Sequence, residues 1–445
     1  MVEFDPRHLE ALNLQAQELL NEVRIMDAPP PRPTTAPTNP VHPVFTFTAE
    51  HIIGNPTFFE RVTTIDGEER ARFWTVGGRR IGWAEESHRK IRVLASGLAS
   101  KGPLKGIVSF KFVLEEIFTW LRDTLEKKST DTLPERLKRR CEEEVHDIEL
   151  WIPLNQTYAK ESFSIGYVTF RTITKDLMDA WYGRLNPPPD PAVSAELNRQ
   201  RSKLQATLAA CTIVHAERSM ASQVALERTV DAVALLRFIS EANWTCRIRS
   251  YCTPLGMQRD DVVTELNMEN GAIKNTSGRV LRPETAAWNV DRCRHQLPGM
   301  LEKLHGFASD NSSTELRKAL FEALLIYSKN TLTLDLAEKL VFVLVSLESL
   351  LLRDSSEPIQ GNLAERLAFL CGETLEERKE IVAITKKAYA LRSQFVHHGR
   401  GIEDVDALDK FLLIAWQALA NLISNFKNFA RREDLISYLN DRRLA

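Results

Sequence analysis

The sequence lacks the usual marks of a disulfide-bonded, zinc-binding or nucleotide-hydrolysing protein. Six cysteines are scattered over 445 residues without a Cys-x-x-Cys pair, which argues against a disulfide framework, a zinc ribbon and a thioredoxin-type redox site. Neither a Gly-x-x-x-x-Gly-Lys-Ser/Thr phosphate loop nor a His-Glu-x-x-His zinc motif occurs. We therefore expect neither a metal nor a cofactor, and we interpret the cysteines as core or surface thiols.

The chain also lacks an excess of either charge and a long apolar run. Lys and Arg number 58 against 60 Asp and Glu, a formal net charge of −2, which excludes a globally basic nucleic-acid binder and leaves only a local site. The most apolar run, Leu340–Leu352, contains polar residues and is shorter than the roughly 20 residues of a membrane span, so it predicts a buried helix. The N-terminus has no basic region followed by an apolar stretch. We expect a cytoplasmic protein that contacts no membrane.

What the sequence does contain is a pattern that changes along its length. Seven prolines fall within residues 28–43, and proline fixes the backbone and removes a hydrogen-bond donor, so this stretch predicts an extended linker. The predicted segments are a separately mobile N-terminal helical arm (1–27), the proline-rich linker (28–44), an antiparallel-rich α+β domain (45–186), a smaller α+β domain (192–308) and a helical bundle (309–445). The expected fold class is α+β, a β-rich mixed N-terminal region followed by an all-α bundle.

Strand patterns are concentrated in the first two thirds of the chain. Asp66-Gly67 suits the positive backbone angles of a tight hairpin turn and stands between two alternating segments. The predicted strands are 62–65, 71–76, 148–152, 164–172, 244–252, 262–268 and 272–280. Helices are predicted at 8–26, 110–126, 134–144, 174–184, 192–203 and 220–238.

After residue 309 the strand patterns cease and helix-start patterns follow. Apolar stripes over 335–353 and 404–429 are typical of helices that bury one face, and short connections favour an antiparallel bundle. Capping boxes, in which the first and fourth residues bond each other's backbone, mark helix starts. The three matches are Ser312 with Glu315, Thr374 with Glu377 and, with Asn as the cap, Asn362 with Glu365.

The helix predicted over residues 376–399 ends in polar side chains that can act on a phosphodiester. Arg392 and His397 lie five residues apart, roughly 140° around the helix and about 7.5 Å along it. A guanidinium can hold a phosphate, and a histidine that titrates near neutral pH can move a proton from a ribose 2′-hydroxyl. The alternative is an ordinary basic helix end. The helix is expected to bury Ile381, Ile384, Ala388, Leu391 and Phe395 and to present Arg392, Ser393, His397 and His398.

The segment Tyr389–Gly399, with the sequence YALRSQFVHHG, resembles the signature of HEPN domains of the ApeA-like type. In these domains a tyrosine precedes an Arg-Ser pair, and a histidine follows with a glycine nearby. The resemblance covers roughly residues 310–430, where Ser346–Leu351 is similar to the acidic second helix and Leu363–Ala368 to the third. Upstream, Ile148–Leu154 and Ile165–Phe170 resemble strands that precede such domains.

The resemblance implies a metal-independent endoribonuclease whose site residues follow by position. Arg392 and His397 match the Arg-x-x-x-x-His motif, so Arg392 would hold the scissile phosphate and His397 would act as general base or acid. Ser393 would orient one of them. Whether His397 or His398 is the main catalytic histidine stays open. The candidate supporting residues are His398, Glu348 and Tyr389.

The resemblance also implies partners. HEPN RNases often act in anti-phage defence or as toxins, and a complete site usually needs two protomers. We therefore expect an RNA substrate, a homodimer or higher homo-oligomer, and a phage-derived activator. The N-terminal region is expected either to sense a trigger or to restrain the nuclease. The alternative function is a non-catalytic HEPN-like module for dimerisation or for binding RNA or nucleotide.

Overall fold

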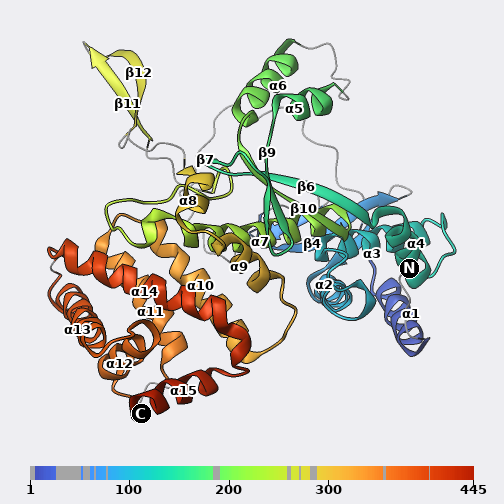
Figure 1. Cartoon of the computed structure of the whole chain (residues 1–445). Coiled ribbons are helices and arrows are strands. Elements are labelled where there is room, and N and C mark those ends of the chain that lie inside the picture. The colour runs from blue at the N-terminus through green and yellow to red at the C-terminus, as the bar shows by residue number, and fades with distance from the viewer. Residues whose placement is uncertain are drawn as a thin grey trace. The chain divides into compact units, whose positions relative to one another are not determined.

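The computed structural model combines small sheets in the N-terminal region with a largely helical C-terminal part (Figure 1). It describes residues 6–26, 52–53, 61–64, 67–76, 79–183, 191–257, 262–269, 272–280, 288–353, 357–399 and 401–444. The predicted proline-rich linker and all but the last residue of the proline cluster at 187–191 lie outside these residues. The small N-terminal sheets and the helical C-terminal part confirm the predicted mixed α+β class.

The chain forms two compact units. Unit 1 comprises Met1–Ile148 with Ile213–Val224, and unit 2 comprises Glu149–Thr212 with Ala225–Ala445. This grouping differs from the expected boundaries because strands on both sides of the proline cluster share one sheet: β9 (Val168–Thr172) pairs antiparallel with β10 (Leu208–Ala216). Helices that follow β10 then share one hydrophobic core with the bundle.

Unit 1 is built on an antiparallel sheet of order β1-β5-β4-β3-β2. The predicted strands around Asp66-Gly67 are confirmed, since β3 pairs antiparallel with β4 and Gly67 has a φ of 84°; Asp66 lies outside the described residues. The strands are β1 (Arg24–Met26), β2 (Ile52–Ile53), β3 (Arg61–Thr64), β4 (Glu69–Val76) and β5 (Arg79–Ala84), and the helices are α1 (Pro6–Asn21), α2 (Glu85–Ser100), α3 (Phe110–Leu125) and α4 (Leu133–Glu144).

Helix α1 belongs to the core of unit 1. Its Leu12, Ala16 and Leu19 are buried with residues of α2, α3 and α4, and the fully buried Trp83 donates its indole N–H to the carbonyl of Leu19 at 2.8 Å. The expectation of a separately mobile arm is therefore wrong, because the apolar face of the helix is buried in this core. The helix also ends five residues early, since β1 pairs with β5.

The mixed part of unit 2 contains a sheet of order β6-β10-β9-β8 and a β11–β12 hairpin. Three of the elements in this part, β6, β10 and α7, have some of their residues in unit 1. The strands predicted at 148–152, 262–268 and 272–280 are confirmed. The further elements are β6 (His146–Pro153), β7 (Thr157–Tyr158), β8 (Phe163–Ile165), α5 (Lys175–Tyr182), α6 (Pro191–Leu204), α7 (Arg218–Leu236), β11 (Val262–Glu269), β12 (Ala272–Val280), β13 (Trp288–Asn289), α8 (Val290–Gln296) and α9 (Met300–Ser309).

Two strand predictions in this part are corrected. The stretch 164–172 is a hairpin of β8 and β9 that turns at Gly166, where φ is 58°. The stretch 244–252 forms no strand, because its backbone groups bond elsewhere: the N–H of Cys246 donates to Asp409 Oδ1 at 2.7 Å and the N–H of Ser250 donates to the carbonyl of Thr331 at 2.6 Å.

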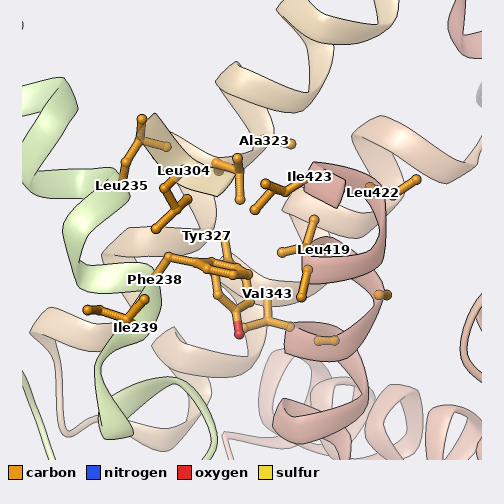
Figure 2. Close-up of a cluster of buried hydrophobic side chains, with 14 of the residues drawn as sticks. Leu235, Phe238, Ile239, Leu304, Ala323, Tyr327, Val343, Leu419, Leu422 and Ile423 are labelled. Carbon is orange, nitrogen blue, oxygen red and sulfur yellow. The ribbon is translucent and has the colours of Figure 1, made fainter. Parts of the chain in front are cut away.

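The helical part of unit 2 shares its core with the end of α7. Figure 2 shows Leu235 and Phe238 with Tyr327, Val343 and Leu419 from three bundle helices. The helices predicted at 335–353 and 404–429 are confirmed. The bundle consists of α10 (Glu315–Ser328), α11 (Leu336–Leu351), α12 (Ile359–Cys371), α13 (Leu375–His398), α14 (Val405–Asn425) and α15 (Arg432–Leu444).

Of the three predicted capping boxes, only Thr374 with Glu377 forms. Helix α10 is capped by Thr314 without a side-chain bond. Helix α12 begins at Ile359 with Pro358 as its N-cap, so Asn362 lies inside the helix and cannot cap it. Among the described residues, one helical stretch, Val405–Asn428, has the length and apolarity of a membrane span, and most of it is buried within the protein.

Candidate functional site

Helix α13 carries the candidate site on its C-terminal half. The capping box fixes its start, and Ile381, Thr385, Ala388 and Leu391 form its buried face. The prediction that Phe395 is buried is wrong: its exposed fraction is 37%. All residues from 393 to 399 are exposed, so the last two turns extend beyond the core and carry Phe395 with them.

A carboxylate from α11 joins two of the predicted residues. Glu348 Oε1 accepts a hydrogen bond from the Tyr389 hydroxyl at 2.7 Å and from Arg392 Nη1 at 3.2 Å. Tyr389 and Arg392 are three residues apart on α13, so they lie on the same face of the helix. The Glu348 side chain is 19% exposed and that of Arg392 is 35% exposed. The ion pair therefore lies at the margin of the core, with the guanidinium partly open to solvent.

The electrostatics of this cluster keep Tyr389 a hydrogen-bond donor. Burial, together with the bond to Glu348, raises the pKa of Tyr389 far above its usual range. Among the described residues, the ion pair through Nη1 is the one polar contact of Arg392. A guanidinium has five N–H donors in a planar fork, so its remaining donors can bind another anion while Glu348 holds one nitrogen.

The two histidines stand at the end of α13. His397 and His398 are exposed, with ring centroids 6.5 Å apart. Gly399 ends the helix in the left-handed region at a φ of 61°, and its N–H donates to the carbonyl of Phe395 at 2.9 Å. Histidines in a last turn interact favourably with the carbonyl end of the helix dipole. Both rings are therefore open to solvent and accessible to a ligand at this end.

The structure brings together part of the predicted site. Glu348, Tyr389 and Arg392 form one cluster, whereas no hydrogen bond within the described residues joins Arg392 to Ser393, His397 or His398. The sequence indicated Glu348 only as a supporting residue, by its similarity to an acidic helix. The contacts of Glu348 with Tyr389 and Arg392 cannot be predicted from the sequence. The one available signal is that Glu348 is an acidic residue within the apolar stripe of α11, where a polar partner is expected.

The described residues around the end of α13 include no cluster of side chains that could hold a metal ion. Among the described residues, no three or more His, Cys, Asp or Glu side chains lie close enough together to hold a metal ion.

A comparison of the chain with models of protein families, with curated proteins and with solved structures finds no match. The site therefore has to be interpreted from its own geometry.

Proposed function

We propose that the chain is a metal-independent endoribonuclease of the HEPN type. The observation that carries the proposal is the C-terminal end of α13, where a guanidinium held at one nitrogen by Glu348 precedes two exposed histidines. This supplies a fixed cation for a phosphate and an imidazole for proton transfer, the two groups that cleavage by an internal nucleophile requires. The resemblance of Tyr389–Gly399 to the HEPN signature supports the same assignment.

In the proposed reaction the ribose 2′-oxygen attacks the adjacent phosphorus. The O2′–P bond forms, the P–O5′ bond breaks, and the products carry a 2′,3′-cyclic phosphate and a 5′-hydroxyl. Either His397 accepts the 2′-hydroxyl proton and a water molecule protonates the leaving O5′, or water accepts the 2′-hydroxyl proton and His397 protonates O5′. The remaining N–H groups of Arg392 stabilise the charge on the phosphate oxygens, and Ser393 orients one of these groups. His398 stands one residue away as the alternative proton carrier.

The proposal includes a homodimer, because one protomer supplies a single Arg392–His397 pair. Phe395 and Val396 are 37% and 58% exposed beside this pair, and packing against a second protomer would remove both apolar side chains from water. A second protomer packed here would place two pairs together. We further propose that the remainder of the chain restrains the nuclease until a phage-derived activator binds, in the cytoplasm.

Cleavage of RNA by purified protein tests the proposal. We expect that Arg392→Ala and His397→Ala each lower the cleavage rate at least 100-fold, since loss of a general base or of a charge-stabilising group typically costs this much. The matched control is His305→Ala, which removes an exposed histidine on α9 and should retain the parental rate. His398→Ala shows which histidine transfers the proton. If Arg392→Ala and His397→Ala cut as fast as the parent, the assignment is wrong.

A non-catalytic HEPN-like module is the second candidate, and the exposed Phe395–Val396 pair favours it as much as it favours the enzyme. It predicts that the parent associates with itself or with RNA without cutting. Measurements of molecular mass, RNA binding and RNA cleavage on the same preparation distinguish the module from the nuclease. RNA binding without cleavage, both with and without a phage lysate fraction as activator, supports the module.

A further inference from the structure

Unit 2 contains a cavity of about 200 Å³ that the proposed nuclease site does not use. The turn between β8 and β9 forms one wall, and α7, α9 and α10 form the others. Val168, Leu235 and Phe321 give these walls an apolar surface. At Gly166 an added Cβ would lie 3.2 Å from the Cβ of Ala308, so the turn packs closely against α9. The packing of these four elements makes the cavity preformed.

Two opposite charges on α7 line this cavity without pairing with each other. Arg228 and Asp231 are three residues apart, which places them on one face of the helix. Among the described residues, Asp231 makes no hydrogen bond or ion pair. The guanidinium of Arg228 lies over the ring of Tyr167, at 5.5 Å from the centroid, and has no polar partner in the same set of residues.

The other polar groups of the cavity already have partners. Arg317 donates from Nε to the carbonyl of Phe307 and from Nη2 to that of Ala308, both at 3.3 Å, and so closes the end of α9. The Tyr167 hydroxyl donates to Asn311 Oδ1 at 2.7 Å, which fixes the ring beneath Arg228. Arg228 and Asp231 are thus the charged side chains of the cavity that have no hydrogen-bond or ion-pair partner among the described residues.

We propose that this cavity binds a free α-amino acid with an apolar side chain. The ligand carboxylate pairs with Arg228, the ligand ammonium pairs with Asp231, and the side chain enters the space between Val168, Leu235 and Phe321. An α-amino acid fits because it carries both charges on a single carbon beside an apolar group. A guanidinium binds a carboxylate through two parallel N–H donors, and burying an aliphatic side chain contributes the apolar part of the affinity.

The state of Asp231 supports this assignment. Burial, with the nearby charge of Glu227, raises the pKa of Asp231 above its usual range. The carboxylate is therefore held at a cost that an ammonium group would offset. A ligand with an anion alone would leave this carboxylate unpaired, and one with a cation alone would leave Arg228 unpaired.

Calorimetric titration of the full chain with L-valine, L-leucine, L-isoleucine, L-methionine and L-phenylalanine tests the proposal independently of nuclease activity. At least one should bind. N-acetyl-L-leucine lacks the ammonium and L-leucinamide lacks the carboxylate, so each should bind at least tenfold more weakly than L-leucine. Asp231→Asn and Arg228→Gln should weaken amino-acid binding at least tenfold, with unfolding midpoints like that of the parent.

Glu322→Gln is the matched control, because Glu322 is exposed on α10 beside Phe321 and does not line the cavity. It should bind as the parent does. The proposal is overturned if none of the five amino acids binds, if the acetylated and amidated forms bind as well as L-leucine, or if Asp231→Asn and Arg228→Gln both keep the parental affinity.

Discussion

One carboxylate oxygen sets the position of the catalytic cation in our account. Glu348 Oε1 accepts from a neutral donor, Tyr389, and from a charged one, Arg392, and hydrogen bonds to ionised groups are the stronger kind. The bond from Tyr389 fixes the carboxylate, and the carboxylate in turn fixes one guanidinium nitrogen. In the proposed nuclease, Glu348 and Tyr389 would therefore be positioning residues that act through Arg392.

Removing the charge of Glu348 should loosen Arg392 without unfolding the bundle. We expect that Glu348→Gln lowers kcat/KM for RNA cleavage about tenfold, equivalent to about 1.4 kcal/mol of transition-state stabilisation. Tyr389→Phe should cost less, because it leaves the ion pair intact. Glu348→Asp, which keeps the charge, should recover part of the loss. Steady-state cleavage kinetics and unfolding midpoints on all three variants check this. Equal losses in Glu348→Asp and Glu348→Gln would contradict a positioning role for the charge.

A second residue, Glu69, makes the stability of unit 1 depend on pH. Burial by itself would raise the pKa of Glu69, but hydrogen bonds from His88 and Arg72 outweigh it and lower the pKa from 4.5 to about 2. Arg72 Nε lies 2.6 Å from Glu69 Oε1 and His88 Nε2 lies 3.1 Å from the same oxygen. Since the folded pKa is the lower one, the stabilisation is complete above pH 4.5 and is lost as the pH falls toward 2.

Glu69→Gln should therefore destabilise unit 1 by up to about 3 kcal/mol at pH 7 and by progressively less as the pH falls from 5 to 2. Hydrogen exchange of β4 and α2 peptides, taken as the ratio of variant to parent at each pH, measures the difference. Glu86→Gln on the surface of α2 is the control and should leave the ratio near one. A destabilisation of equal size at pH 7 and pH 3 would show that the carboxylate charge is not its source.

At the scale of the element, periodicity predicted most helices and strands, and local chemistry decided the exceptions. The apolar stripes predicted α11 and α14 because each of these two helices buries a continuous face. The capping box predicted the start of α13. The stretch 244–252 was mistaken for a strand because two buried cysteines, Cys246 and Cys252, imitate an apolar pattern. Burial of Phe395 was predicted from the helical repeat alone, which cannot show where a helix leaves its core.

The end of α13 depends on the conformation of Gly399. At a φ of 61° a side chain other than glycine is strained, and the cost for an L-residue is about 1–2 kcal/mol. Gly399→Ala should therefore destabilise the last turn by about 1 kcal/mol and lower RNA cleavage, since His397 and His398 lie within that turn. Gly401→Ala is the control, because an added Cβ there meets no atom within 4 Å and no positive φ opposes it. Backbone hydrogen exchange at residues 393–399 and cleavage rates measure both effects. Equal behaviour of the two variants would show that the helix end is not fixed by Gly399.

For the whole molecule, the sequence predicted the candidate site only as far as one helix contains it. Arg392 and His397 both lie on α13, five residues apart, so their separation follows from helical geometry. Glu348 is separated from Arg392 by 44 residues, and only the packing of α11 against α13 brings the two together. The division into two units was equally hidden, because β9 and β10 pair across the proline cluster that separated the segments in the sequence.

Self-association through the Phe395–Val396 pair should be necessary for activity. Val396→Asp would bury an unpaired charge at a forming interface, which is strongly unfavourable, so we expect a shift from dimer to monomer and a loss of cleavage. Val93→Asp is the control, since Val93 is 66% exposed on α2 of unit 1. Light scattering coupled to size-exclusion chromatography measures the mass. A Val396→Asp dimer with parental activity would contradict the composite site.

The ends of the RNA fragments test the central claim most directly. RNA incubated in EDTA with the purified chain, alone and with a phage lysate fraction, is examined by mass spectrometry beside parallel incubations with His397→Ala. Our account predicts fragments with 2′,3′-cyclic phosphate and 5′-hydroxyl ends that are produced in EDTA by the parent and not by His397→Ala. Fragments with 5′-phosphate ends, cleavage that EDTA abolishes, or identical fragments from His397→Ala would contradict it.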